Sequence, residues 1–204
     1  EGLRYGYVGT FGVDVPGTTG FNEAGLTVAA HTRFHRDIRF DGAAIMDLCH
    51  DIIRRAETIE DAQRIASERP VASTWGLMIA SAKEGAAAVL ETTGEAVRIV
   101  RPRGKESFVT CSNLHRHPDL VDDQVIPFPA WTEHADGRER RLRQIANKGS
   151  LSALDLMSAL GDNCDPDCCE PPRPAGGVLA QPMSVTSVVL EPETRSMFLS
   201  VGDT

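Results

Sequence analysis

The strands that the sequence predicts follow one another through short hairpin turns, and this constrains the fold more than any other feature of the chain. Three strand-like runs, over 75–81, 86–91 and 96–101, are separated by Lys83-Glu84-Gly85 and Thr93-Gly94-Glu95. Short turns of this composition join antiparallel strands. Parallel strands would need a longer crossover connection, usually a helix. The pattern therefore excludes a doubly wound parallel fold.

The remaining elements are expected on both sides of this run of strands. Helices are predicted over 43–56, from Thr58 onward, over 138–146 and over 153–160, and further strands over 3–13, 26–32, 107–111, 184–190 and 196–201. Apolar residues recur at helical spacing in the first helix, and Thr58 and Ser152 are N-cap residues. This order predicts an α+β fold in which helices cover the outer faces of antiparallel sheets.

Composition narrows the class of protein. A chain of 204 residues with 41% apolar content can bury a full core, so we expect a single domain over residues 1–204. The net charge of −8 argues against nucleic acid or an anionic membrane as the main partner. No apolar run reaches the ~18 residues of a membrane span. The odd number of cysteines, five, favours a reducing cytoplasm.

Two groups of residues invite a metal-site interpretation. His115 and His117 are two residues apart, a spacing that places two side chains on the same face of a strand. The second group, Cys164, Cys168 and Cys169, lies in one Pro- and Gly-rich loop over 162–182. However, no local cluster completes the histidine pair, and adjacent cysteines rarely chelate one ion. We therefore expect ordinary loop cysteines, no metal and no cofactor.

Four stretches of sequence carry a family resemblance. They are GTTGFNEAGLTVAAHT at 17–32, TIEDAQRIASERPVAS at 58–73, WGLMIASAKEGAAAVLE followed by VTCSNLH within 75–115, and TSVVLEPETRSMFLSVG at 186–202. Taken in order, they resemble the cysteine-type N-terminal-nucleophile (Ntn) hydrolases. The branch that they resemble is the acyl-CoA:6-aminopenicillanic acid acyltransferase-like peptidases, to which bile-acid hydrolases and penicillin V acylases are related.

The resemblance implies a four-layer αββα sandwich of antiparallel sheets and chemistry on amide bonds. A cysteine at the mature amino terminus would attack the carbonyl carbon, with its own α-amino group as the base. The oxyanion donors would be the backbone N–H at Thr32, or a residue on either side of it, and the side-chain amide of Asn113. Arg140 or Arg141 would support the nucleophile. The local sequence alone favours turn residues: Asn22-Glu23 would shape the turn into the second strand, and Asn113 would open the loop before Pro118. For Asn113, the family resemblance favours the oxyanion role instead.

The sequence departs from the family pattern at two points. No cysteine occurs among the 21 residues before Asn22. In the family, the nucleophilic cysteine lies farther upstream of this motif than these 21 residues reach. In TCSNLH, Ser112 replaces the usual threonine. The sandwich is thus expected to lack its first strands, and the chain is a fragment, a processed piece with a companion chain, or an inactive relative.

Three functions follow from these alternatives. The first is an amidohydrolase or acyltransferase that matures by autoproteolysis and acts on a small-molecule amide or acyl substrate once the missing N-terminal segment is supplied. The second is a catalytically inactive binding or scaffold protein. The third is an unrelated metal-dependent protein that uses the cysteine cluster. A homo-oligomer is compatible with all three.

Overall fold

The computed structural model describes residues 2–9, 17–167, 175–181, 184 and 186–201. The chain divides into two compact units, residues 1–125 with 192–195 and residues 126–191 with 196–204. The expectation of one domain over 1–204 stays a prediction. Cys168, Cys169 and the second half of the strand predicted over 3–13 lie outside the described residues.

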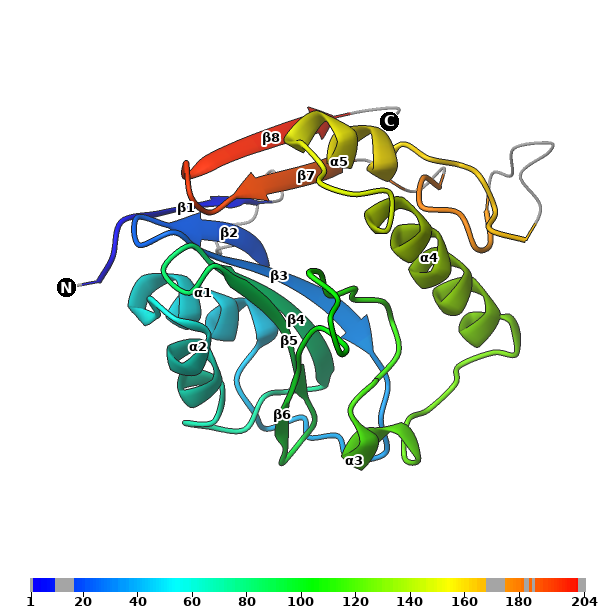
Figure 1. Ribbon diagram of the computed structural model, residues 1–204. Coiled ribbons are helices and arrows are strands. Elements are labelled where there is room, and N and C mark those ends of the chain that lie inside the picture. Colours follow the sequence, from blue (N-terminus) through cyan, green and yellow to red (C-terminus); the bar gives the residue numbers. More distant parts are fainter. Residues whose placement is uncertain (1, 10–16, 168–174, 182–183, 185, 202–204) are drawn as a thin grey trace. The chain divides into compact units, whose positions relative to one another are not determined.

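The first unit is built on a six-stranded sheet in which the strands lie side by side in sequence order (Figure 1). These strands are β1 (Tyr5–Val8), β2 (Thr19–Asn22), β3 (Leu26–Arg33), β4 (Thr74–Ser81), β5 (Ala86–Thr92) and β6 (Val97–Val100). Every neighbouring pair is antiparallel. The hairpins expected after β4 and β5 are present, and the prediction of an α+β fold with antiparallel sheets is confirmed.

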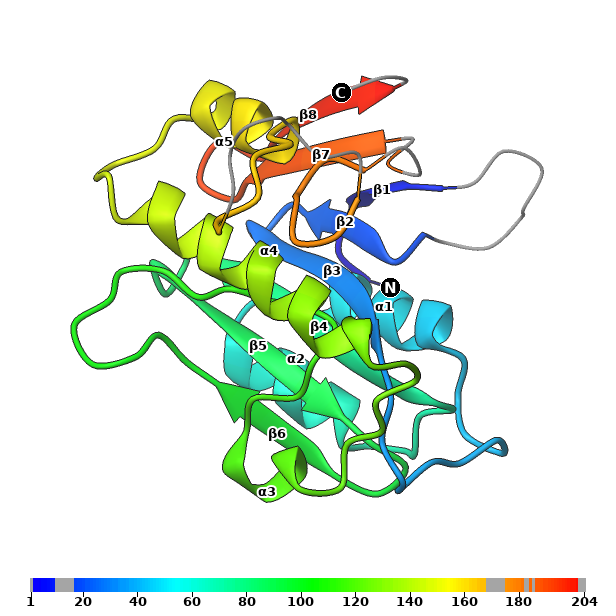
Figure 2. The same cartoon turned by 90° about the vertical axis from the view of Figure 1, so that its right-hand side faces the viewer.

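Two helices, α1 (Ile45–Arg55) and α2 (Ile59–Ala66), cover the same face of this sheet (Figures 1 and 2). The apolar residues whose spacing predicted α1 form the side of the helix that is buried. They are Ile45, Leu48, Cys49, Ile52 and Ile53. These residues form one core with Leu26, Val28, Leu77, Ile79 and Leu90 of the sheet. Thr58 caps α2 by accepting a hydrogen bond from the Asp61 N–H at 3.1 Å, an interaction typically worth ~1 kcal/mol.

One local prediction for the first unit is wrong. The run at 107–111 forms no strand. The end of this run contacts β3 through the side chain of Arg33, which donates to Cys111 Sγ at 3.3 Å and to the Ser112 carbonyl at 3.2 Å, and not through backbone pairing. Strand β2, which pairs with both β1 and β3, was not expected. A short helix, α3 (Pro118–Val121), was not expected either.

The second unit contains two helices and a hairpin. They are α4 (Ala130–Ala146), α5 (Ala153–Leu160), β7 (Thr186–Glu191) and β8 (Ser196–Val201), and the two strands pair antiparallel. Ser152 caps α5 as predicted, within a reciprocal capping box with Asp155. Helix α4 begins eight residues before the predicted start, directly after Pro129. No helix in the described part of the chain has the length and apolarity that a membrane span requires.

Candidate active site

Asn113 and Thr32, far apart in the sequence, meet at the end of strand β3. The Asn113 side chain donates from Nδ2 to the Thr32 carbonyl oxygen at 2.9 Å. An amide NH2 group carries two hydrogens, so this bond uses one of them and fixes the plane of the amide. Asn113 is half-buried and Thr32 is exposed, which leaves the pair accessible from solvent.

The Thr32 backbone N–H points to the same edge of β3. Two residues earlier, Ala30 donates its N–H to the Thr18 carbonyl at 3.1 Å, on the β2 side of the strand. Alternate residues of an antiparallel strand direct their N–H and C=O groups to the same edge. Thr32 therefore directs both groups away from β4, toward Asn113. The structure thus brings together the two donors that the sequence predicted, whose joint role in catalysis stays a prediction.

A buried ion pair lies next to these donors. Arg33 of β3 and Glu91 of β5 pair across β4 with exposed fractions of 1% and 0%, on the face of the sheet opposite α1 and α2. Gly76 of β4 lies between them, in register with Glu91. A methyl group at Gly76 would lie 2.4 Å from Arg33 Nε, so glycine is the residue that leaves room for the pair.

The ion pair holds the segment 111–117, which contains Asn113. On one side of Asn113, Arg33 Nε donates to the Ser112 carbonyl at 3.2 Å. On the other side, Glu91 accepts from the Arg116 N–H at 2.9 Å and from the His117 N–H at 3.0 Å. These are charge-assisted hydrogen bonds to buried groups, and such bonds are strong. The segment has no regular secondary structure, so these bonds take the place of a ladder.

The charge of Glu91 is stabilised by its neighbours. Burial alone raises the pKa of a carboxyl, but the contacts from His115 and Arg33 and the two backbone N–H groups outweigh it and lower the pKa of Glu91 to about 2. Glu91 therefore stays ionised at neutral pH. The pair was missed in the sequence because Arg33 and Glu91 lie on separate strands. The available signal was a charged residue at the end of each strand, on the face opposite the apolar residues.

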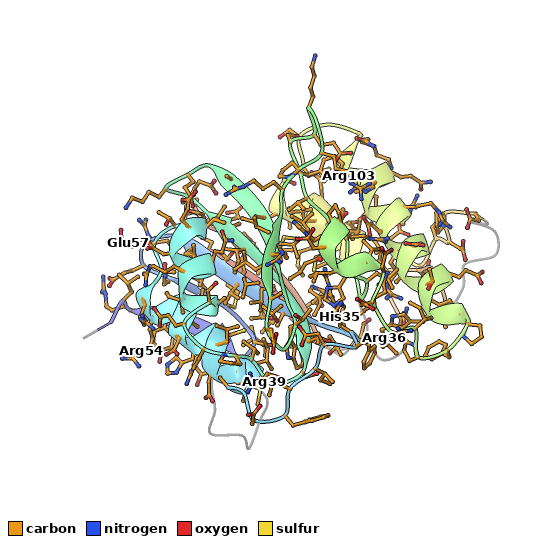
Figure 3. All side chains as sticks on the ribbon, turned by 90° about the horizontal axis from the view of Figure 1, so that it is seen from below. His35, Arg36, Arg39, Arg54, Glu57 and Arg103 are labelled. Carbon is orange, nitrogen blue, oxygen red and sulfur yellow. The ribbon has the colours of Figure 1, made fainter. Side chains whose placement is uncertain are left out.

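Two histidines pack beside the pair. His35 lies where the chain leaves β3 next to Arg36 (Figure 3), and its ring is 5.3 Å from that of His115. Burial lowers the pKa of His115, which favours the neutral ring. His115 Nδ1 is 3.5 Å from the Glu91 carboxylate, and this long contact is the one that contributes to the lowered pKa of Glu91. Among the described residues, no three His, Cys, Asp or Glu side chains are grouped as a metal site would need.

Arg140 lies in the second unit, on α4. It is half-exposed and pairs with Asp167 at 2.5 Å, while Arg141 pairs with Asp162 at the same distance. The role of Arg140 beside the nucleophile stays a prediction. Arg138, which the sequence pattern did not single out, differs from both because burial lowers its pKa.

Three other expectations concern Asn22 and the remaining cysteines. Asn22 is a structural residue, as its side chain donates to the carbonyls of Ile53 and Ala56 and accepts from the N–H groups of Ala24 and Leu26. Cys111 is buried and forms no disulfide, and its Sγ accepts a hydrogen bond from Arg33 at 3.3 Å. Cys164, expected to be an ordinary loop cysteine, is disulfide-bonded, and a sulfur in a disulfide does not serve as a thiolate ligand.

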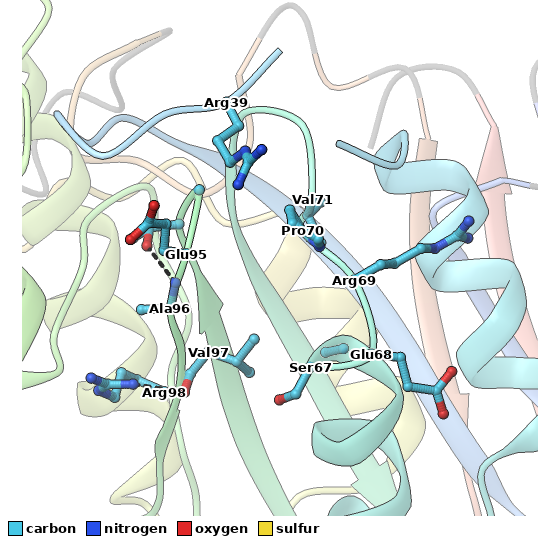
Figure 4. Close-up of a pocket in the computed structure, with 13 residues that line it drawn as sticks. Arg39, Ser67, Glu68, Arg69, Pro70, Val71, Glu95, Ala96, Val97 and Arg98 are labelled. Carbon is cyan, nitrogen blue, oxygen red and sulfur yellow. Dashed lines mark hydrogen bonds between the residues drawn. The ribbon is translucent and has the colours of Figure 1, made fainter. Parts of the chain in front are cut away.

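A pocket of about 440 Å³ lies elsewhere in the first unit, between the end of α2 and the β5–β6 turn (Figure 4). Its three arginines, Arg39, Arg69 and Arg98, each pair with an aspartate. Because those charges are already compensated, the pocket has no built site for an anion. Neither Thr32 nor Asn113 lines it.

Comparisons with known proteins identify the family of the chain. No curated protein sequence matches the chain. Among solved structures, a penicillin V acylase from Agrobacterium tumefaciens matches 98% of this chain and 67% of its own, with a TM-score of 0.53 and 16% identity, which shows a shared Ntn-type fold. The model of the family described as acyl-coenzyme A:6-aminopenicillanic acid acyl-transferase matches residues 4–155, more than half of the chain. The chain therefore belongs to the acyl-coenzyme A:6-aminopenicillanic acid acyl-transferase family.

Proposed function

We propose that this protein cleaves or forms amide bonds through an acyl-enzyme, using an N-terminal cysteine encoded upstream of Glu1. The observation that supports this function most directly is the meeting of the Asn113 amide with the Thr32 backbone at one exposed edge. Family membership and the shared fold support the same class of reaction. The substrate class is a small-molecule amide, and we take penicillin V as the probe because the structural neighbour is named for it.

The proposed reaction has two steps. The cysteine thiolate attacks the amide carbonyl carbon, and the oxygen becomes an oxyanion that accepts hydrogen bonds from Asn113 Nδ2–H and Thr32 N–H. The C–N bond then breaks, the α-ammonium group of the cysteine gives its proton to the leaving amine, and a thioester remains. Water or a second amine then attacks the thioester carbonyl carbon and gives a proton to the α-amino group. The C–S bond breaks, the thiolate is restored, and a carboxylic acid leaves after attack by water or a new amide after attack by the amine.

The other parts of the proposal follow from the family resemblance. We propose that the cysteine is exposed by autoproteolysis, that it is supplied by an upstream segment or a companion chain, and that Arg140 or Arg141 supports it. A cytoplasmic location and a homo-oligomer belong to the same proposal. The alternative is an inactive Ntn-like binding or scaffold protein, which the departure from the family motif at Ser112 would favour.

The test begins with the complete reading frame that encodes Glu1–Thr204. We expect a cysteine upstream, and the protein made from the whole frame should release the amine product from penicillin V. Intact-mass spectrometry of a quenched reaction should show one acyl group on the chain that begins with cysteine. A reading frame without such a cysteine, or a mature protein without turnover on penicillin V and a panel of other N-acyl amides, would support the inactive alternative.

A further inference from the structure

The segment 111–117 has a feature that its own sequence does not explain, since a loop without secondary structure is held at points on both sides of Asn113. Arg33 binds the carbonyl of Ser112, the residue directly before Asn113, at 3.2 Å. Glu91 binds the N–H groups of Arg116 and His117, at 2.9 and 3.0 Å. Both anchors belong to one buried ion pair. The pair therefore acts on the loop as a unit.

The same pair is linked to the second donor. Arg33 directly follows Thr32 in β3, and Thr74 Oγ1 donates to the Arg33 carbonyl at 2.7 Å, so the backbone at this point is fixed against β4. One residue thus connects the strand that carries the Thr32 N–H with the loop that carries the Asn113 amide. A shift of the Arg33 guanidinium would change the distance between the two donors.

Global stability is a weak explanation for this arrangement. Removing two charges from water is expensive, and a buried ion pair is often no more stabilising than apolar side chains of equal size. Here the charges also require a glycine at position 76 of a strand interior, where glycine is unfavourable. The bonds from the pair are instead concentrated on the loop around Asn113.

We propose that Arg33 and Glu91 are positioning residues, whose ion pair holds the Ser112–His117 backbone so that the Asn113 amide stays beside Thr32. This inference rests on the proposed function for its catalytic meaning, because the two donors matter for the reaction only if they bind the oxyanion. The structural part, that the pair orders the loop, can be tested without any activity.

The first test is hydrogen exchange in the Arg33→Met/Glu91→Leu double variant, which replaces both charges by apolar side chains. We expect near-native resistance to urea, while the amides of residues 112–117 exchange at least tenfold faster and those of β4 and β5 do not change. The matched control is Arg55→Met/Glu68→Leu, which removes the partly exposed pair between α1 and the end of α2. It should leave the loop unchanged.

Glu91→Gln supplies a second variant of nearly native shape, in which the loop should also exchange faster. Unchanged exchange in 112–117 in either folded variant would overturn the proposal. Failure of both variants to fold would overturn it as well, because the pair would then serve folding rather than local position.

The second test uses penicillin V turnover by the mature protein. We expect the double variant to lose about a hundredfold in kcat with KM changed less than threefold, and Arg33→Lys not to restore the rate, because a lysine cannot bind the Ser112 carbonyl and Glu91 in the same geometry. A wild-type protein without turnover would refute the proposed function and leave the exchange result to decide the positioning role. Turnover that survives in the double variant would refute the positioning role alone.

Discussion

A methyl group at position 76 should cost more stability than its small size suggests. In Gly76→Ala, the new Cβ would lie 2.4 Å from Arg33 Nε, 2.5 Å from Cζ and 2.6 Å from Nη2. These distances are roughly 1 Å shorter than an ordinary contact of about 3.5 Å. The backbone of β4 cannot retreat, because it pairs with β3 and β5 on its two sides. The guanidinium must therefore move off Glu91 and off the loop.

The loss in free energy of unfolding can be estimated from the separated Arg33–Glu91 pair that this movement produces. Separating a buried ion pair leaves uncompensated charge and typically costs ~3–5 kcal/mol. Simple overpacking of a core accounts for only about 1–3 kcal/mol. We expect Gly76→Ala to lower the free energy of unfolding by about 3–5 kcal/mol, measured by urea denaturation with tryptophan fluorescence as the signal.

Two controls separate this mechanism from a general intolerance of alanine. Gly85→Ala places its methyl group in open space but at a φ of +58°, so only backbone strain of about 1–2 kcal/mol is expected there. In the Arg33→Met/Glu91→Leu background, Gly76→Ala should lose most of its effect. The mechanism is refuted if Gly76→Ala costs no more than Gly85→Ala, or if its cost is the same with and without the ion pair.

Three further predictions concern the core of the first unit. Asn22→Ala removes two hydrogen bonds to carbonyls at the end of α1 and two within the β2–β3 turn, and should cost about 2–4 kcal/mol in urea denaturation. The pKa of Glu91 is lowered from 4.5 to about 2, so its contribution to the free energy of unfolding is complete above pH ~5 and is lost as the pH falls toward 2. The Arg33→Met/Glu91→Leu variant should therefore lose less stability over this acid range than the wild type, as measured by urea denaturation. Burial raises the pKa of the Cys49 thiol to about 12, so iodoacetamide should label Cys49 only as fast as the protein unfolds. Peptide mass spectrometry would measure the labelling rate, and rapid labelling of the native protein would contradict this prediction.

The elements that the sequence predicted well carry their signals locally. Thr58 and Ser152 cap the helices that follow them, and both hairpin turns between β4 and β6 occur where glycine and polar residues cluster. In each case the residues that make the signal are within a few positions of the structure that they specify. Periodicity likewise identified the buried side of α1, because helix geometry alone decides which residues share a face.

The elements that the sequence did not predict depend on partners far along the chain. The run at 107–111 has the composition of a strand but forms none, and the contacts at its end come from Arg33, which is distant in the sequence. The ion pair itself joins two strands through a space left by Gly76 on a third. Only the register of the sheet shows that these three residues are neighbours. Asn113 and Thr32 could be singled out beforehand because their motifs resemble those of a family.

Asn113 and Thr32 are proposed to bind the oxyanion of an amide substrate, and the rate of acyl-enzyme formation tests this role most directly. The mature protein and its Asn113→Ala variant would be mixed with penicillin V, quenched and weighed by intact-mass spectrometry, with Asn147→Ala, an exposed asparagine after α4, as the control. We predict that Asn113→Ala forms the acyl-enzyme about a hundred- to a thousandfold more slowly, with urea resistance unchanged, and that Asn147→Ala does not differ from the wild type. Acylation of Asn113→Ala at the wild-type rate would contradict the proposed role.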